Sequence, residues 1–197
     1  MSTRPDRSAK PTREVVLDAL ETLLLDGGSS AATLEAVAAA AGVSKGGLLY
    51  HFGSKEALYQ GFLDRLLVES KAEADGTLTA PEGVVAAYLD VSSVADDPST
   101  RSVLAALRLA GVQEVDVEAA LVQSFEYWYE VIARQVTDPV LARLVQLVGD
   151  GLYLHALIGT ATRDQDDEVV ARVVTLVAEH EHEHEHEHQR EREHRGA

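Results

Sequence analysis

The sequence contains no cysteine and few aromatic residues. Its 197 residues include three Phe, one Trp and six Tyr. The absence of cysteine excludes disulfide bonds, thiolate metal sites and cysteine nucleophiles. Because 46% of the residues are hydrophobic and so few are aromatic, the core has to be built mainly from Leu, Val and Ala. This composition favours packed helices over a β-sandwich.

Long hydrophobic runs are also lacking. No apolar stretch reaches the roughly 18–20 residues that a membrane helix needs. The polar, basic start MSTRPDRSAKPTR has none of the apolar segment typical of a secretory signal. We therefore expect a cytoplasmic protein with no membrane partner. No Ser/His/Asp order, paired carboxylates or phosphate loop indicates enzyme chemistry, so we expect neither catalysis nor a required cofactor.

Negative charge dominates the chain but is unevenly distributed. The formal net charge is −16 at pH 7. Residues 1–60 hold six Lys and Arg against seven Asp and Glu, a net charge of −1, which leaves −15 for residues 61–197. Four of those six cations lie between Arg4 and Arg13. A near-neutral front with a basic arm is compatible with DNA binding, and the arm either adds phosphate or minor-groove contacts or is idle.

Apolar residues recur at helical spacing along most of the chain, and Gly, Pro and N-capping residues separate the segments. No segment before the tail alternates with a period of two, and no internal repeat is visible. The sequence therefore predicts an all-α fold of about nine helices. The expected helices cover residues 11–26, 33–41, 45–52, 55–73, 81–94, 98–109, 117–136, 138–160 and 166–180.

The two short helices expected around AGVS have the spacing of a helix-turn-helix. Gly42 can adopt the left-handed turn conformation without a Cβ penalty, and Ala38 is small where the helices cross. Gly46 and Gly47 should cost about 1 kcal/mol each relative to Ala inside the second helix. A helix whose backbone lies close to DNA can contain glycines despite that cost, because the absent side chains permit the close approach. The alternative is an ordinary helical hairpin.

The segment TLEAVAAAAGVSKGGLLYHFGSKEALYQGFLDRL resembles the DNA-binding domain of the TetR/AcrR family of transcriptional regulators, and the likeness covers about residues 12–67. It shares an alanine-rich helix, an A-G-V-S turn, a recognition helix ending in Y-H-F and then S-K-E-x-L. The resemblance implies a homodimeric repressor that binds a pseudo-palindromic operator in double-stranded DNA and is released by a small-molecule effector. It implies an arm and DNA-binding domain at 1–54, a ligand-binding and dimerisation domain at 55–179, and a polar tail at 180–197.

The resemblance also implies roles for individual residues. Those expected to contact phosphates are Thr33, Tyr50, His51 and Lys55, and those expected to face the groove are Ser44, Lys45, Gly46 and Leu49, with Gly47 at close approach. Many members of the family carry bulky or polar residues in place of the two glycines, so we expect Lys45 to carry more of the base readout. Tyr50 has an alternative place in the core beside Leu49.

The C-terminal part contains an aromatic cluster that either packs in the core or lines an apolar ligand pocket. The candidate pocket residues are Phe125, Trp128 and Tyr129, with Asp150, Tyr153 and His155 as polar groups. The family resemblance implies that the last two helices, about 138–160 and 166–180, form a four-helix bundle across the dimer axis. The valine stripe at 169–177 fits that use.

The tail contains HEHEHEHEH. On a continuous helix His180, His184 and His188 would share one face, which could chelate a divalent metal weakly, with Glu as an additional donor. The alternative is a solvated tail, because such a site would lack groups to orient the imidazoles. A metal-binding protein or metal-responsive regulator is therefore the second hypothesis for function.

Overall fold

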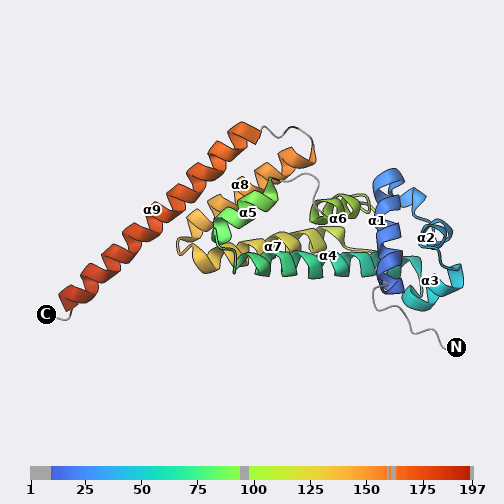
Figure 1. The fold of residues 1–197 in the computed structure, drawn as a ribbon. Helices are drawn as coiled ribbons and strands as arrows, with labels where there is room; N and C mark the ends of the chain where they lie inside the picture. The colour runs from blue at the N-terminus through green and yellow to red at the C-terminus, as the bar shows by residue number, and fades with distance from the viewer. Residues whose placement is uncertain (1–9, 94–97, 159, 161–162, 196–197) are drawn as a thin grey trace, which may run out of the picture. The chain divides into compact units, whose positions relative to one another are not determined.

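The computed structural model describes residues 10–93, 98–158, 160 and 163–195 (Figure 1). These residues form nine helices and no strand, which confirms the predicted all-α fold. The helices are α1 (Thr12–Ala31), α2 (Leu34–Ala40), α3 (Lys45–Phe52), α4 (Lys55–Thr77), α5 (Val84–Ser92), α6 (Pro98–Leu107), α7 (Val117–Gln135), α8 (Pro139–Leu157) and α9 (Arg163–Arg195).

Two helix ends differ from the sequence-based expectation. The first helix was expected to stop before Gly27, but helical structure resumes after a break at Gly28 (φ 68°, ψ −169°) and continues to Ala31. The last helix was expected to end near residue 180, yet α9 runs through the His/Glu stretch to Arg195. Glutamate is a good helix former, so the composition of this segment does not stop the helix.

The contacts divide the chain into two compact units. Unit 1 comprises residues 1–68 and 98–122, and unit 2 comprises 69–97 and 123–197. The long helix α4 therefore begins in unit 1 and ends in unit 2, and α6 belongs to unit 1 although α5 belongs to unit 2. These packing units are not the functional domains expected at 1–54 and 55–179, and that division stays a prediction.

The core of unit 1 is built on the apolar face of α1. Leu17, Leu20 and Leu24 recur at spacings of three and four residues and are fully buried. Phe62 of α4 and Leu48 of α3 are buried in the same cluster. Helix α1 packs against α2 on one side and α6 on another, so it connects the helix-turn-helix to the rest of the unit.

The core of unit 2 includes a buried tyrosine from α5. The Tyr88 hydroxyl donates towards the Gln146 carbonyl oxygen at 3.1 Å and the Asp150 Oδ1 atom at 3.2 Å, and its ring centroid lies 5.3 Å from that of Trp128. A Cβ atom added to Gly149 would overlap the Tyr88 ring. Helix α8 can therefore lie this close to α5 only because position 149 has no side chain.

The Asp150 carboxyl is partly desolvated at this site. Burial raises the pKa of Asp150 above its ordinary value, although the hydrogen bond from Tyr88 and the charge of Arg143 act in the opposite direction. Burial, followed by the charge of Asp150, also raises the pKa of the Tyr88 hydroxyl, which stays protonated at neutral pH.

Helix α8 is the one helix in the described part of the chain that is long and apolar enough to satisfy a length-and-composition test for a membrane span. Its mean hydropathy is 1.2, and 39% of it is buried inside the protein. The core helix of a soluble protein passes the same test, and Arg143 and Asp150 interrupt the apolar surface of α8.

We predict that Gly149→Ala lowers the free energy of unfolding by about 1–3 kcal/mol, because the new methyl group would displace the Tyr88 ring. Urea denaturation followed by circular dichroism measures the change. Gly76→Ala is the matched control, since a Cβ atom at this exposed helical position meets no neighbouring atom. It should leave stability unchanged or raise it by up to about 1 kcal/mol. Equal effects of the two variants would contradict the close-packing argument.

Candidate nucleic-acid interface

Helices α2 and α3 and the turn between them form the helix-turn-helix that the sequence predicts (Figure 1). Gly42 adopts a φ of 66° in the turn, and the Val43 amide donates to the Ala38 carbonyl oxygen at 2.9 Å. Val37 and Leu48 are fully buried, so the two helices are held by apolar contacts on their inner faces. Their outer faces are left available for a partner.

Three hydroxyl side chains cap the helices of this region. The Thr33 Oγ1 atom accepts from the Ala36 amide at 3.1 Å, and the Ser44 Oγ atom accepts from the Gly47 amide at 3.0 Å. Ser54 Oγ caps α4 in the same way. The Thr33 and Ser44 hydroxyls keep their own hydrogens to donate, so both can contact a phosphate oxygen while they cap.

The structure distinguishes the two glycines of α3. A Cβ atom added to Gly46 would find only the Ser44 Oγ atom, at 4.0 Å, so no neighbour inside the described residues requires a glycine there. At Gly47 the same addition would approach that oxygen to 3.2 Å and crowd the N-cap. The helix-propensity cost at Gly46 is therefore unexplained by internal packing, whereas a closely approaching external partner would explain it.

Lys45 begins α3, and its ammonium group pairs with the Glu35 carboxylate of α2. Sequence reasoning missed Glu35 as part of this surface, because its partner Lys45 lies ten residues further along the chain on another helix. The hydrogen bond from Lys45 lowers the pKa of Glu35, which is therefore ionised throughout the neutral range. A partner that binds Lys45 has to share it with this carboxylate or displace it.

Tyr50 is exposed over 87% of its surface, which excludes the alternative that it belongs to the core. Its ring stands edge-on to the exposed His51 ring, with centroids 5.4 Å apart. Leu49, by contrast, is half-buried and packs against the core of unit 1. A fully exposed tyrosine beside a histidine provides two donors at the end of α3.

Lys55 lies in the first turn of α4, with its ammonium 5.2 Å from the centre of the Tyr59 ring. The Tyr59 hydroxyl in turn donates towards the carbonyl oxygens of Ser29 at 3.3 Å and Ala32 at 3.4 Å. Tyr59 thus fixes the end of α1 against α4. Of the basic arm, Lys10 pairs with Asp18, while Arg4 and Arg7 lie outside the described residues.

The candidate ligand residues all lie in unit 2. Trp128 and Asp150 meet at Tyr88, a residue that the sequence did not indicate. Phe125 and Tyr129 are half-buried, and the Phe125 carbonyl oxygen accepts from Gln146. Tyr153 is also half-buried, and His155 is exposed.

A pocket of about 390 Å³ lies elsewhere, within unit 1. None of the six candidate ligand residues contributes to it, so the effector site stays a prediction. The pocket is lined by Ser29, Ser30, Lys55, Glu56, Tyr59, Gly111, Val112, Gln113 and Glu114.

The first residues of the tail contact the turn between α7 and α8. The His180 Nε2 atom lies 3.5 Å from the Asp138 carboxylate, and Glu181 accepts hydrogen bonds from the amide and hydroxyl of Thr137, each at 3.0 Å. His184 stacks at 5.6 Å from His180, whereas the side chain of His188 lies outside the described residues. No three His, Asp or Glu side chains of the described part gather as metal ligands.

Comparison with known proteins identifies both halves of the chain. Residues 16–61 match the model of bacterial regulatory proteins of the tetR family, and residues 82–179 match the model of tetracyclin repressor-like C-terminal domains. A search of curated proteins finds no match.

Solved structures show the same fold. SCO7518 from Streptomyces coelicolor A3(2) is 24% identical, with a TM-score of 0.63, over 84% of this chain and 99% of that one. The multidrug binding protein EbrR, complexed with imidazole, is 22% identical, with a TM-score of 0.59, over 84% and 96%. NalD, the secondary repressor of the MexAB-OprM multidrug efflux pump in Pseudomonas aeruginosa, is 20% identical, with a TM-score of 0.58, over 84% and 95%.

The two matched segments together cover most of the chain, and the first contains the helix-turn-helix and its capping residues. This combination of domains is that of DNA-binding regulators rather than of enzymes. The chain belongs to the TetR family of transcriptional regulators.

Proposed function

We propose that this TetR-family regulator is a homodimeric repressor that binds a pseudo-palindromic operator through α3 and leaves it when a small-molecule effector binds. The observation that carries the proposal is the outer face of α3, where the bare Gly46 backbone lies between Lys45 and the exposed Tyr50. Major-groove recognition uses the N-terminal residues of such a helix. The proposed activity needs no cofactor and takes place in the cytoplasm.

The nine DNA-binding residues divide into three groups in this proposal. Lys45 reads base edges, and Gly46 and Gly47 let the backbone approach the groove. The hydroxyls of Thr33 and Tyr50, the His51 imidazole and the Lys55 ammonium hold phosphates, and Ser44 faces the groove beside Lys45. Leu49 contributes its half-buried side chain mainly to the position of α3.

The exposed face of α8 supports dimerisation. Its large apolar residues recur at spacings of three, four and seven, a pattern typical of a helix that packs on another helix. They are Val140, Leu144, Leu147, Leu154 and Ile158, and each is at least 43% exposed. In the predicted dimer stripe of α9, Val173 and Val177 are buried in the core of unit 2, whereas Val169 is 44% exposed. A second copy of α8 is the occupant we propose for this face.

Release by effector is proposed as a shift between two populations of the dimer. Recognition helices have to reach successive major grooves about 34–36 Å apart, so a ligand that favours another spacing lowers DNA affinity. Trp128 and Asp150 around Tyr88 are the groups we propose to contact the effector. The multidrug binding protein and the efflux-pump repressor among the structural neighbours support an organic effector. Weak metal binding by the tail stays a prediction without a formed site.

DNA selected from genomic fragments by the wild-type protein provides the test of operator binding. Lys45→Ala and Lys55→Ala should each lower affinity on the order of tenfold. Lys55→Ala should also reduce the slope of log affinity against log salt by about one, because Lys55 is proposed to hold a phosphate, whereas Lys45→Ala should relax the preference for particular bases. Lys71→Ala is the control, because Lys71 is an exposed lysine of unit 2 paired with Asp75. Selection of no specific DNA by the wild type would contradict the proposed function.

Dimerisation is tested separately by sedimentation velocity. The wild type should sediment at about twice the chain mass of 21.2 kDa. Leu147→Glu places a charge in the middle of the α8 face and should give a monomer. Leu78→Glu serves as the matched control, since Leu78 is also an exposed leucine of unit 2 but lies outside α8. A dimer that survives Leu147→Glu would show that another surface forms the interface.

A further inference from the structure

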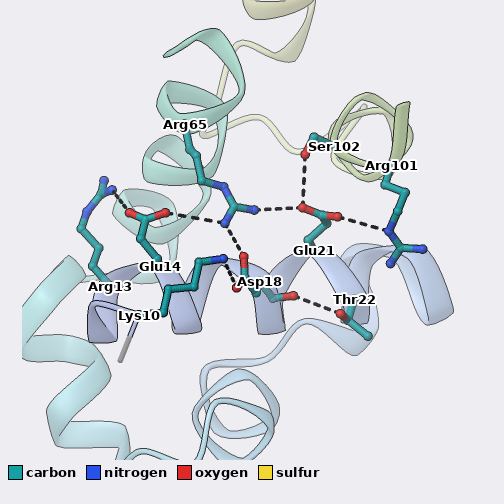
Figure 2. A network of polar contacts seen from close by, with 9 residues as sticks. All are labelled: Lys10, Arg13, Glu14, Asp18, Glu21, Thr22, Arg65, Arg101 and Ser102. Carbon is teal, nitrogen blue, oxygen red and sulfur yellow. Dashed lines mark hydrogen bonds and ion pairs between the residues drawn. The ribbon is translucent and has the colours of Figure 1, made fainter. Parts of the chain in front are cut away.

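A buried arginine of α4 lies against the acidic face of α1. The side chain of Arg65 is 8% exposed, and its guanidinium donates to Asp18 Oδ1 at 2.7 Å and to Glu21 Oε2 at 2.9 Å. A third carboxylate of α1, that of Glu14, lies 3.7 Å away (Figure 2). The three acidic residues are four and three positions apart, so one face of α1 presents all of them to one guanidinium.

Glu21 differs from the other two carboxylates because α6 also binds it. The Ser102 hydroxyl donates to Glu21 Oε2 at 3.2 Å, and the Arg101 Nε atom lies 3.6 Å from Glu21 Oε1 (Figure 2). The Glu21 side chain is 15% exposed, so solvent screens these contacts less than it screens a surface pair. A single carboxylate of α1 thus joins α4 on one side and α6 on the other.

The other two carboxylates, those of Asp18 and Glu14, have additional partners near the start of α1 and, in the described part of the chain, not on α6. Asp18 also accepts from Lys10, and Glu14 lies near Arg13, both of which are exposed residues near the start of α1. Partial burial opposes ionisation of Asp18, but the hydrogen bonds from Lys10 and Arg65 outweigh it and lower the pKa of Asp18. Within the described residues, Glu21 is the α1 carboxylate for which α6 supplies partners.

The position of α1 matters for the interface because α1 leads directly into the helix-turn-helix. Helix α1 packs on α2, and its last residues are tied to α4 by the Tyr59 hydroxyl. At the other end of α1, the Arg13 guanidinium covers the Phe52 ring of α3 at 5.3 Å. A rotation of α1 about its own axis would therefore move the partners of both α2 and α3.

We propose that Glu21 is a positioning residue for DNA binding, through which α6 acts on α1 and hence on α2 and α3. Ser102 and Arg101 influence the affinity for DNA by holding the Glu21 carboxylate in the orientation in which Arg65 also binds it. The inference rests on the proposed DNA binding and assigns a role in DNA affinity to contacts that would otherwise serve stability alone.

A double-mutant cycle in DNA affinity separates this role from a purely structural one. The variants of the full-length protein are Glu21→Gln, Arg101→Ala with Ser102→Ala, and all three changes combined, each measured against DNA selected by the wild type. We expect Glu21→Gln and the α6 double change each to weaken binding by about 5- to 20-fold. The combined variant should bind no more weakly than Glu21→Gln alone, because α6 then has no carboxylate to hold.

If Glu21→Gln fails to fold, comparison of Ser102→Thr with Ser102→Ala still tests the proposal. Ser102→Thr retains the hydroxyl and should keep DNA affinity within about twofold of the wild type, whereas Ser102→Ala should weaken it. Asp75→Asn is the control, because it breaks an exposed ion pair with Lys71 in unit 2 and should leave DNA affinity unchanged. Thermal melting establishes that each variant is folded at the temperature of the binding assay.

Unchanged DNA affinity in Ser102→Ala would overturn the proposal, and so would additive effects of the α6 changes and Glu21→Gln. Equal weakening by Ser102→Thr and Ser102→Ala would also overturn it, because the hydroxyl would then not be the active group. A wild-type protein that selects no specific DNA contradicts the proposed function instead, so the two failures are distinguishable.

Discussion

The ion-pair network of Arg65 is the constraint on which the arrangement of unit 1 depends. Burying a guanidinium is costly unless charges and hydrogen bonds compensate for the lost water, and three carboxylates of α1 supply that compensation. Because hydrogen bonds are directional, these partners add an orientation requirement to the leucine packing between α1 and α4. Helices α2 and α3 pack against α1. The orientation of the proposed DNA-binding surface therefore depends on a charge cluster that includes none of the proposed base contacts.

Among the residues that the structure describes, the core of unit 2 contains a buried tyrosine in place of a buried ion-pair network. Tyr88 is a large side chain with a polar end, and it is accommodated because Gly149 leaves space for the ring and Asp150 accepts from the hydroxyl. The arrangement places an aromatic surface, a carboxyl and the Trp128 ring at one point of an otherwise aliphatic core. These are the groups to which we assign contact with the effector in the proposal above.

The fold and the helix-turn-helix could largely be predicted from the sequence, because local signals determine them. Thr33 and Ser44 cap helices by accepting from amides three residues further on, and Gly42 adopts the left-handed conformation predicted for the turn. The contacts of Glu21 with Ser102, by contrast, join residues 81 positions apart in sequence, and no pattern in one sequence reveals such a pair. Tyr88 was missed for the same reason, since its partners lie on α8.

The continuity of α9 has a practical consequence for anyone who shortens this protein. Residue 180 looks like a natural place to remove the His/Glu stretch, but Glu181 is the acceptor for the Thr137 amide, and His180 lies against the Asp138 carboxylate that caps α8. A chain cut at residue 179 would lose both contacts at the α7–α8 corner. A cut after residue 184 keeps that corner intact and still removes most of the polar extension, so the two cuts separate the role of the corner from that of the tail.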